Sequence, residues 1–343
     1  MKVKIGDLTK IRTGKLDANV ASDAGQYPFF TCSKEPLKIS TYSYDCECVL
    51  IAGNGDLNVK YYNGKFDAYQ RTYIIEDNGS GKLYMPYLYY FMEGYIEELR
   101  KQAIGGVIKY IKLGNLTDAL IELPSVNEQK GIVEILEKIK NVIDMRNEEI
   151  SNLDNLIKAR FVERFGDAIH NDKGWKTDTV DNLCEEIYGG GTPSKAHPEY
   201  YEDGDIPWVS SKDMKTDVLT DSQIKINQLG VDNSTAKIVP VNSVIMVIRS
   251  GILKHTLPIA INVVPITVNQ DLKVFIPGER VLTRFLAVQF KMLEKDILSG
   301  VRAVTADNIE FNSLKQRELI VPPIELQKEY VAFLEQIDKS KVA

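Results

Sequence analysis

The sequence of 343 residues is long enough for two or three domains, and its 44% hydrophobic and 26% charged residues exclude a disordered or low-complexity chain. Its apolar runs are far shorter than the roughly 20 residues that cross a bilayer, and its amino terminus lacks the apolar core of a signal peptide. We therefore expect a cytoplasmic protein. The net charge of −6 does not by itself indicate a nucleic-acid partner, so the local distribution of charge has to decide.

The cysteines and histidines predict no metal site. The four cysteines contain no CxxC pair and the three histidines are scattered, so the sequence shows neither a disulfide framework nor a metal-ligand spacing. Cys46 and Cys48 flank Glu47 at strand-like spacing, but no histidine lies near them in the sequence. Buried or half-buried small side chains are the simpler interpretation of these cysteines.

Residues 1–124 contain the short elements that are typical of an α+β domain. Residues 5–15 are expected to form a short helix that runs into a glycine turn. Residues 27–33 and 48–56 have the composition of strands. Residues 103–111 are expected to leave a helix at a glycine and to continue as an extended stretch.

Residues 125–166 have the strongest periodicity in the chain. Apolar residues alternate at four- and three-residue steps, which is the pattern of a heptad seam. The seam residues are Ile132, Leu136, Ile139, Ile143, Ile150, Leu153 and Ile157. Pro124 marks the entry and Gly166 the exit, so the pattern predicts a helix of about 40 residues, roughly 60 Å long.

Residues 167–343 repeat this plan. Residues 322–337 align without gaps to residues 124–139, with Pro, Gln, Lys, Val, Leu, Glu and Ile in the same places. Within residues 167–321, four segments correspond to those named above for the first domain: 180–195, 205–211, 243–251 and 297–305. Residues 322–343 are predicted to form a second, shorter helix with Tyr330, Leu334 and Ile337 on its seam.

The predicted fold is therefore α+β: two similar domains of mixed α/β structure joined by long helices, with an internal repeat. A heptad seam is unstable in water, so each helix needs a partner, and the other copy is the simplest one. We expect an antiparallel coiled coil. The part of the first helix that the shorter second helix does not reach is expected to bind another protein or a second copy. The alternative is a long helix packed only on its own domains.

Several segments are specific in combination. They are GGGTPSKAHPEYYEDGDIPWVSSKDM (189–214), VNQDLKVF (268–275), RFVERFGD (160–167) and the two helix starts IELPSVNEQKGIVEILEKI and LIVPPIELQKEYVAFLEQI. In the order domain, helix, domain, helix, they resemble the specificity subunit of type I restriction-modification systems. The resemblance covers nearly the whole chain.

This resemblance implies a DNA-recognition subunit that does no chemistry itself. Each domain would be a target recognition domain that reads one half of a bipartite site. The helices would hold the two domains at a fixed separation about a pseudo-two-fold axis and dock two modification subunits. Those partners would bind S-adenosylmethionine and methylate adenine, and restriction subunits that use ATP would join through them. No cofactor is expected in this chain.

The sequence departs from the family pattern in two places. The second helix stops about halfway along the length of the first, so a specificity subunit that needs a second chain to complete its helix is an alternative. In the first domain, GKLDANVASDAGQYPFF lacks the TPS and IPWVS signatures of the second domain.

DNA reading requires cationic and amide side chains on loops, because arginine and lysine contact guanine edges and phosphates while asparagine and glutamine contact adenine. The candidates in the first domain are Lys15, Asn54, Asn58, Lys60, Tyr69, Gln70, Arg71 and Lys109. Those in the second domain are Ser194, Lys195, Ser211, Lys212, Arg249, Ser250, Lys254, Asn269, Gln270 and Arg302. The pair Gln70 and Arg71 and the pair Asn269 and Gln270 are expected at corresponding places. Trp175 and Trp208 are expected to be core anchors.

Other functions have weaker sequence support. The chain contains no adenine-methylation tetrapeptide and no metalloprotease or serine-hydrolase signature, and Gly189–Gly191 lacks the lysine of a phosphate-binding loop. Asp45, Glu47 and Asp56 could hold magnesium in a nuclease, but acidic residues in turns are usually turn residues. The remaining alternative is a coiled-coil scaffold that binds protein and not DNA.

Overall fold

The computed structural model describes residues 1–300, 302–303 and 307–342, and the chain folds into two compact units, Met1–Arg146 and Asn147–Ala343. The boundary falls inside one helix, α3 (Val126–Phe165), so each unit contains part of it. Helix α3 begins and ends within one residue of the predicted limits. The domain limits of 1–124, 125–166, 167–321 and 322–343 stay predictions.

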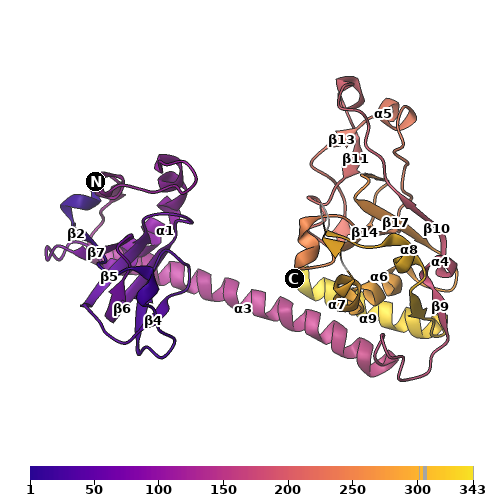
Figure 1. Ribbon diagram of the computed structural model, residues 1–343, viewed down its shortest axis with the longest axis horizontal. Helices are drawn as coiled ribbons and strands as arrows, with labels where there is room; N and C mark the ends of the chain where they lie inside the picture. Colours follow the sequence, from indigo (N-terminus) through magenta and orange to yellow (C-terminus); the bar gives the residue numbers. More distant parts are fainter. Residues whose placement is uncertain (301, 304–306, 343) are drawn as a thin grey trace. The chain divides into compact units, whose positions relative to one another are not determined.

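The first unit is a six-stranded sheet with one long helix beside it (Figure 1). The strands lie in the order β2 (Thr9–Thr13), β7 (Thr72–Asp77), β5 (Tyr44–Ala52), β6 (Val59–Ala68), β3 (Tyr27–Phe30) and β4 (Leu37–Ile39). Neighbouring strands are antiparallel except β3 and β6, which are parallel. The other elements are β1 (Lys2–Lys4), which pairs with β8 (Leu120–Glu122), helices α1 (Met85–Gln102) and α2 (Leu113–Thr117), and 3-10 turns η1 (Ile5–Asp7) and η2 (Ala18–Val20).

Strand β5 lies inside this sheet because both of its faces are apolar. Successive side chains of a strand point to opposite faces. Val49 and Ile51 belong to the buried cluster that contains Leu88 of α1, whereas Leu50 belongs to a second cluster with Phe66. The sheet therefore buries apolar side chains on both faces.

The second unit contains a five-stranded and a three-stranded sheet. The first has the order β10 (Cys184–Gly189), β17 (Leu272–Pro277), β14 (Val244–Val247), β15 (Ile259–Asn262) and β12 (Val218–Leu219). The second has the order β13 (Lys225–Ile226), β11 (Ile206–Val209) and β16 (Thr267–Val268). The remaining strands are β9 (Thr177–Thr179), which pairs with β20 (Glu318–Ile320), and β18 (Arg302–Ala303), which pairs with β19 (Asp307–Asn308). The helices are α4 (Val180–Leu183), α5 (Gln228–Asp232), α6 (Thr283–Met292), α7 (Glu294–Ser299), α8 (Phe311–Lys315) and α9 (Ile324–Val342), with 3-10 turns η3 (Pro198–Tyr200) and η4 (Gly251–Lys254).

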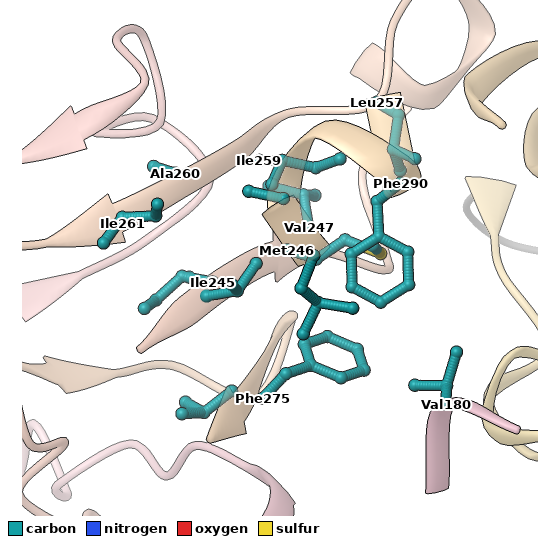
Figure 2. Packing of buried hydrophobic residues seen from close by; sticks show 14 of the residues in the cluster. Val180, Ile245, Met246, Val247, Leu257, Ile259, Ala260, Ile261, Phe275 and Phe290 are labelled. Atoms are coloured by element: carbon teal, nitrogen blue, oxygen red, sulfur yellow. The ribbon is translucent and has the colours of Figure 1, made fainter. Parts of the chain in front are cut away.

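The core of the second unit forms where helix α6 meets the five-stranded sheet. Figure 2 shows Met246 of β14, Phe275 of β17 and Phe290 of α6 close together. The rings of Phe275 and Phe290 have centroids 5.1 Å apart, and both side chains are fully buried. Burial of these rings together with the many aliphatic side chains of the cluster stabilises the core.

The two units share one strand order. The run β2, β7, β5, β6 corresponds to β10, β17, β14, β15, and the parallel pair β6 and β3 corresponds to the parallel pair β16 and β11. The single strand β6 thus corresponds to two strands, β15 and β16. Pro265 lies in the break between them, and a proline cannot donate a ladder hydrogen bond.

The start of each unit corrects one prediction. A strand, not the expected helix, leads into each glycine turn: β2 precedes Gly14 and β10 precedes Gly190. The helical part is confined to η1 and α4, which come before these strands. Thr9, Ile11 and Thr13 place β-branched side chains at every second position of β2, a pattern that favours a strand.

Helix α3 is attached to the first unit by a buried glutamine. The Gln129 side chain is fully buried, and its Oε1 accepts a hydrogen bond from the backbone N–H of Tyr84, 2.8 Å away. Its Nε2 donates to the carbonyl oxygens of Lys82 at 2.8 Å and Pro124 at 2.9 Å. Two hydrogen bonds therefore join the start of α3 to the segment that leads into α1, and the third, to Pro124, stays within the start of α3.

Helix α9 is attached to the second unit in the same way. The buried Gln327 accepts from the backbone N–H of Leu282 at 3.0 Å and donates to the carbonyls of Arg280 at 3.0 Å and Pro322 at 2.9 Å. This glutamine is one of the residues that the two copies of the helix start have in common. The sequence identity at this position therefore marks a repeated attachment.

Within the second unit, α9 runs antiparallel to the adjacent part of α3. Glu329 forms an ion pair with Arg164, and farther along α9 Lys341 pairs with Asp154 at 2.5 Å. Between these pairs the Tyr330 hydroxyl donates to the carbonyl oxygen of Ile157 at 2.9 Å. Burial raises the pKa of this tyrosine. The yellow helix beside the C-terminal half of α3 in Figure 1 is α9.

The predicted seam residues fall into three classes. On α9, Tyr330, Leu334 and Ile337 are buried. On α3, Leu136, Ile150, Leu153 and Ile157 are half-buried. The seam residues Ile132, Ile139 and Ile143 are exposed, as are Ile135, Val142 and Met145 nearby. The seam is therefore covered where α9 reaches it.

Candidate nucleic-acid interface

In the first unit, four loops meet at the ends of the strands. The backbone N–H of Gly53 donates to the carbonyl of Arg71 at 2.8 Å, and that of Gln70 donates to Leu16 at 2.9 Å. The backbone N–H of Gly55 donates to Lys109, also at 2.9 Å. These bonds bring the predicted candidates Lys15, Asn54, Gln70, Arg71 and Lys109 onto neighbouring loops. We call this group the first reading cluster.

The exposed side of the first reading cluster is hollow. Gln70, Arg71 and Tyr110 line a cleft of about 310 Å³ together with Gly53 and Tyr73. Gln70, Arg71, Lys15 and Lys109 are exposed, and Tyr69 is half-buried.

Two other candidates in the first unit, Asn58 and Lys60, bind each other and Cys32. The Asn58 side chain donates to the carbonyl of Cys32 at 2.8 Å, and Lys60 donates to the Asn58 side chain. The Cys32 thiol donates to Oδ1 of Asn54 at 2.9 Å. Burial lowers the pKa of Lys60. These side chains support the loop beneath the first reading cluster.

In the second unit, the ends of the corresponding strands also meet. The backbone N–H of Ile248 donates to the carbonyl of Asp271 at 2.9 Å, and that of Asn269 donates to Val209, also at 2.9 Å. Arg249 forms an ion pair with Asp271 at 2.7 Å, and Gln270 accepts a hydrogen bond from the Thr192 hydroxyl. We call Arg249, Gln270 and Asp271 the second reading cluster.

The two reading clusters occupy equivalent positions. Tyr69 donates from its backbone to Phe30 of β3 at 2.9 Å, as Asn269 does to Val209 of β11. Gln70 therefore corresponds to Gln270. The paired strands give the remaining equivalences: Asn54 with Arg249 and Arg71 with Asp271.

These equivalences correct two predicted alignments. The pair Asn269 and Gln270 does not correspond to Gln70 and Arg71, because it is shifted by one residue. Asn269 is also 7% exposed, and its amide donates to Asp271 while accepting from the Asp271 backbone, so it shapes the turn and does not face solvent. The second correction concerns residues 103–111. Ile111 corresponds to Ile309 and not to a residue of 297–305, because the backbone N–H of Ile111 donates to the carbonyl of Gly53 and that of Ile309 donates to the equivalent carbonyl of Ile248.

A glycine is required beside each reading cluster. A Cβ atom on Gly190 would lie 1.9 Å from the carbonyl oxygen of Val268, and one on Gly14 would lie 2.1 Å from that of Ala68. Any larger residue would clash with backbone at both places. The loops after β10 and β2 can therefore cross the neighbouring strand end only if positions 190 and 14 are glycine.

The remaining candidates of the second unit lie on loops around the second reading cluster. Ser211, Lys212 and Ser250 line a cleft of about 600 Å³ that also contains Lys215 and Lys291. Ser194, Lys195 and Lys254 are exposed, and the Ser194 hydroxyl accepts from the backbone N–H of Ala196 at 3.3 Å. The side chain of Arg302 lies outside the described residues.

The two tryptophans are anchors, as predicted. Trp208 is 7% exposed and donates from its ring nitrogen to the carbonyl of Gly191 at 2.9 Å. Half-buried Trp175 donates to the carbonyl of Phe165, also at 2.9 Å. Trp208 thus ties the glycine loop to the three-stranded sheet.

Lys273 lies beside Arg249 of the second reading cluster. Burial and the neighbouring Arg249 guanidinium lower the pKa of Lys273, whose ammonium lies 4.4 Å from the centre of the Phe311 ring. Sequence reasoning missed Lys273, Lys215 and Lys291 as neighbours of the site, and it missed the role of Asp271. Alignment of Arg71 with Asp271 was the signal that could have identified this residue.

In residues 1–300, 302–303 and 307–342, no three histidine, cysteine or acidic side chains are grouped so that they could hold a metal ion. No helix in the described part of the chain is long and apolar enough to span a membrane.

A known sequence family matches both parts of the chain. The sequence model of the type I restriction modification DNA specificity domain matches residues 1–155 and 172–343. The chain belongs to this family. The first reading cluster lies in the first matched stretch and the second reading cluster in the second.

Relatives in this family include three specificity subunits. The chain is 39% identical over 156 residues to the type I restriction enzyme EcoDI specificity subunit of Escherichia coli, over 46% of this chain and 34% of that protein. It is 30% identical over 291 residues to the EcoR124I/EcoR124II specificity subunit of Escherichia coli, over 81% and 68%. It is 23% identical to the MjaIX specificity subunit of Methanocaldococcus jannaschii, over 69% and 58%. The matched part is thus between about one third and two thirds of each relative's length.

Two solved structures share the fold. The crystal structure of a type I restriction-modification S subunit from M. genitalium matches 99% of this chain and 90% of that chain, with a TM-score of 0.61 and 16% identity. A structure from work on complex assembly and conformational transition of the type I R-M system matches 100% and 90%, with a TM-score of 0.54 and 16% identity. These similarities support the two-domain α+β fold.

Proposed function

We propose that this chain is the DNA-recognition subunit of a type I restriction-modification complex, in which each unit reads one half of a bipartite DNA site. The observation that carries the proposal is the repetition of one exposed cluster at equivalent strand ends, in two units that both match the DNA specificity domain. Two readers of the same design on one chain suit a split recognition sequence. The chain itself is the reader, and catalysis resides in its partners.

The partners follow from this role. Modification subunits, two per chain, carry S-adenosylmethionine and methylate adenine, and restriction subunits that use ATP join through them. The helices α3 and α9 form an antiparallel coiled-coil spacer that sets the distance between the half-sites and docks the modification subunits. The complex acts on double-stranded DNA in the cytoplasm.

The exposed apolar side chains on the first half of α3 suit a docking role. Six of them, between Ile132 and Met145, are 38% to 62% exposed. Surfaces of this kind usually bind another protein, because a row of exposed isoleucines is unfavourable in water. A modification subunit is the proposed occupant, and a second copy of this chain is the other candidate.

The proposal is tested by co-expressing this chain with the methyltransferase subunit of its own system and mapping methylated adenine in the host genome. A split motif, with two short defined parts around a fixed unspecified spacer, is the expected result. The paired variant Ile139→Ser and Ile143→Ser should keep the chain folded but reduce methylation by weakening assembly. A complex that forms but methylates no defined sequence would favour the coiled-coil scaffold.

A further inference from the structure

The two reading clusters place different chemistry on the same backbone positions. Where the first unit has Asn54 and Arg71, the second has Arg249 and Asp271. The first unit therefore has its arginine in the turn between β6 and β7, whereas the second unit has its arginine after β14. In the second unit an aspartate takes the position that is equivalent to Arg71. Gln70 and Gln270 are the same residue in both units.

Asp271 holds Arg249 in one orientation. Its Oδ1 accepts from Nε and from Nη2 of Arg249, each at 2.7 Å. Its Oδ2 accepts from the side-chain amide of Asn269 at 3.2 Å. The carboxylate is therefore fixed on both sides, and it fixes the plane of the guanidinium in turn.

The fixed guanidinium keeps donors for a ligand. An arginine has five N–H donors, of which Asp271 engages only those on Nε and one side of Nη2. The Arg249 side chain is 48% exposed, and the neighbouring Lys273 adds a second positive charge. The geometry suits a planar acceptor with two adjacent oxygen or nitrogen atoms. In the DNA major groove, O6 and N7 of guanine are such a pair.

We propose that Arg249, positioned by Asp271, reads a guanine in the half-site of the second unit. This inference rests on the proposed function, because it assigns one base to one residue of the same interface. Arg249 is the specificity-determining residue, and Asp271 is a positioning residue that acts through it. The first unit has Asn54 at the equivalent position, which carries no guanidinium and cannot make the same contact.

The test uses the full chain in complex with the methyltransferase subunit and a library of random duplex DNA. Bound duplexes are selected and sequenced for wild type, Arg249→Lys, Asp271→Asn and the control Arg280→Ala. Arg280 is an exposed arginine of the same unit that pairs with Asp178 at 2.7 Å. Lysine keeps the charge of Arg249 but loses the planar fork, so it separates base reading from phosphate binding.

The variants are expected to lose the preference for guanine at one position of the motif. Arg249→Lys should reduce the preference for that base about 10- to 100-fold, which corresponds to the loss of a bidentate base contact. Asp271→Asn should reduce it at the same position by a smaller factor, and Arg280→Ala should leave it unchanged. The other half of the motif should be the same in all four selections.

Two results would overturn the inference and leave the proposed function standing. One is a bipartite wild-type motif that Arg249→Lys selects with the same guanine preference. The other is a uniform loss of affinity at every position, which is the behaviour of a phosphate contact. If wild type selects no bipartite motif, the proposed function itself fails.

Discussion

The two units position their loops with the same backbone contacts but carry different side chains on those loops. The hydrogen bonds that connect the strand ends are repeated, and so are the glycines and the buried glutamines that position the loops and helices. The exposed residues on this frame differ, as Arg71 and Asp271 do. A duplicated protein can therefore keep the frame that orders its loops and change what the loops recognise.

The helices differ between the units in a second way. Tyr330 of α9 is buried among aromatic rings, whereas Ile132, the residue at the equivalent place in α3, is 38% exposed. Both lie three residues after the attachment glutamine. The same helix start is thus followed by a covered face in one unit and an open face in the other.

The largest effect on stability is expected at the two glycines where there is no space for a Cβ atom. Gly190→Ala should lower the free energy of unfolding of the second unit by about 3 kcal/mol or more, because its Cβ would overlap the backbone of Val268. Gly14→Ala should do the same in the first unit. Calorimetric unfolding of the full chain measures both. Gly251→Ala is the matched control, since a Cβ there meets nothing within 4 Å. An unfolding transition of Gly190→Ala that equals that of the wild type would show that the loop after β10 does not require glycine at this position.

The attachment glutamines should give the next largest effect. Gln129→Leu and Gln327→Leu each remove a buried amide and leave one backbone N–H and two carbonyls without their partner, which should cost about 2 to 3 kcal/mol. Denaturant titration followed by circular dichroism checks the cost. Gln336→Leu, at an exposed position of α9, should change the midpoint little. A large cost for one glutamine and none for the other would contradict a shared role.

Much of the frame could be predicted from the sequence, because it depends on local pattern. The heptad spacing predicted α3. The gap-free match of residues 124–139 with residues 322–337 aligned Gln129 with Gln327 in the sequence. The reading clusters were harder to predict. Their alignment is set by backbone bonds from Tyr69 to β3 and from Asn269 to β11, which join residues far apart in the sequence, so an alignment by residue type shifted Asn269 by one position.

The contacts between side chains could not be predicted at all. Arg249 and Asp271 are 22 residues apart and come together only because β14 and β17 are neighbours. The need for Gly190 likewise depends on the position of a carbonyl on β16. Such facts follow from tertiary structure, whereas a residue such as Trp208 could be predicted as an anchor from its size and apolar surroundings.

The smallest effect tests the difference between the two helices. Tyr330→Phe removes a hydroxyl that donates to the carbonyl of Ile157, and it should lower the free energy of unfolding of the second unit by about 1 kcal/mol. Ile132→Ala, at the equivalent position, should change that of the first unit by less than about 0.5 kcal/mol, because exposed side chains contribute little. Both are measured on the isolated chain at one low concentration. A cost for Ile132→Ala as large as that for Tyr330→Phe would mean that the first half of α3 is already covered without a partner subunit, and its role as a docking face would then be wrong.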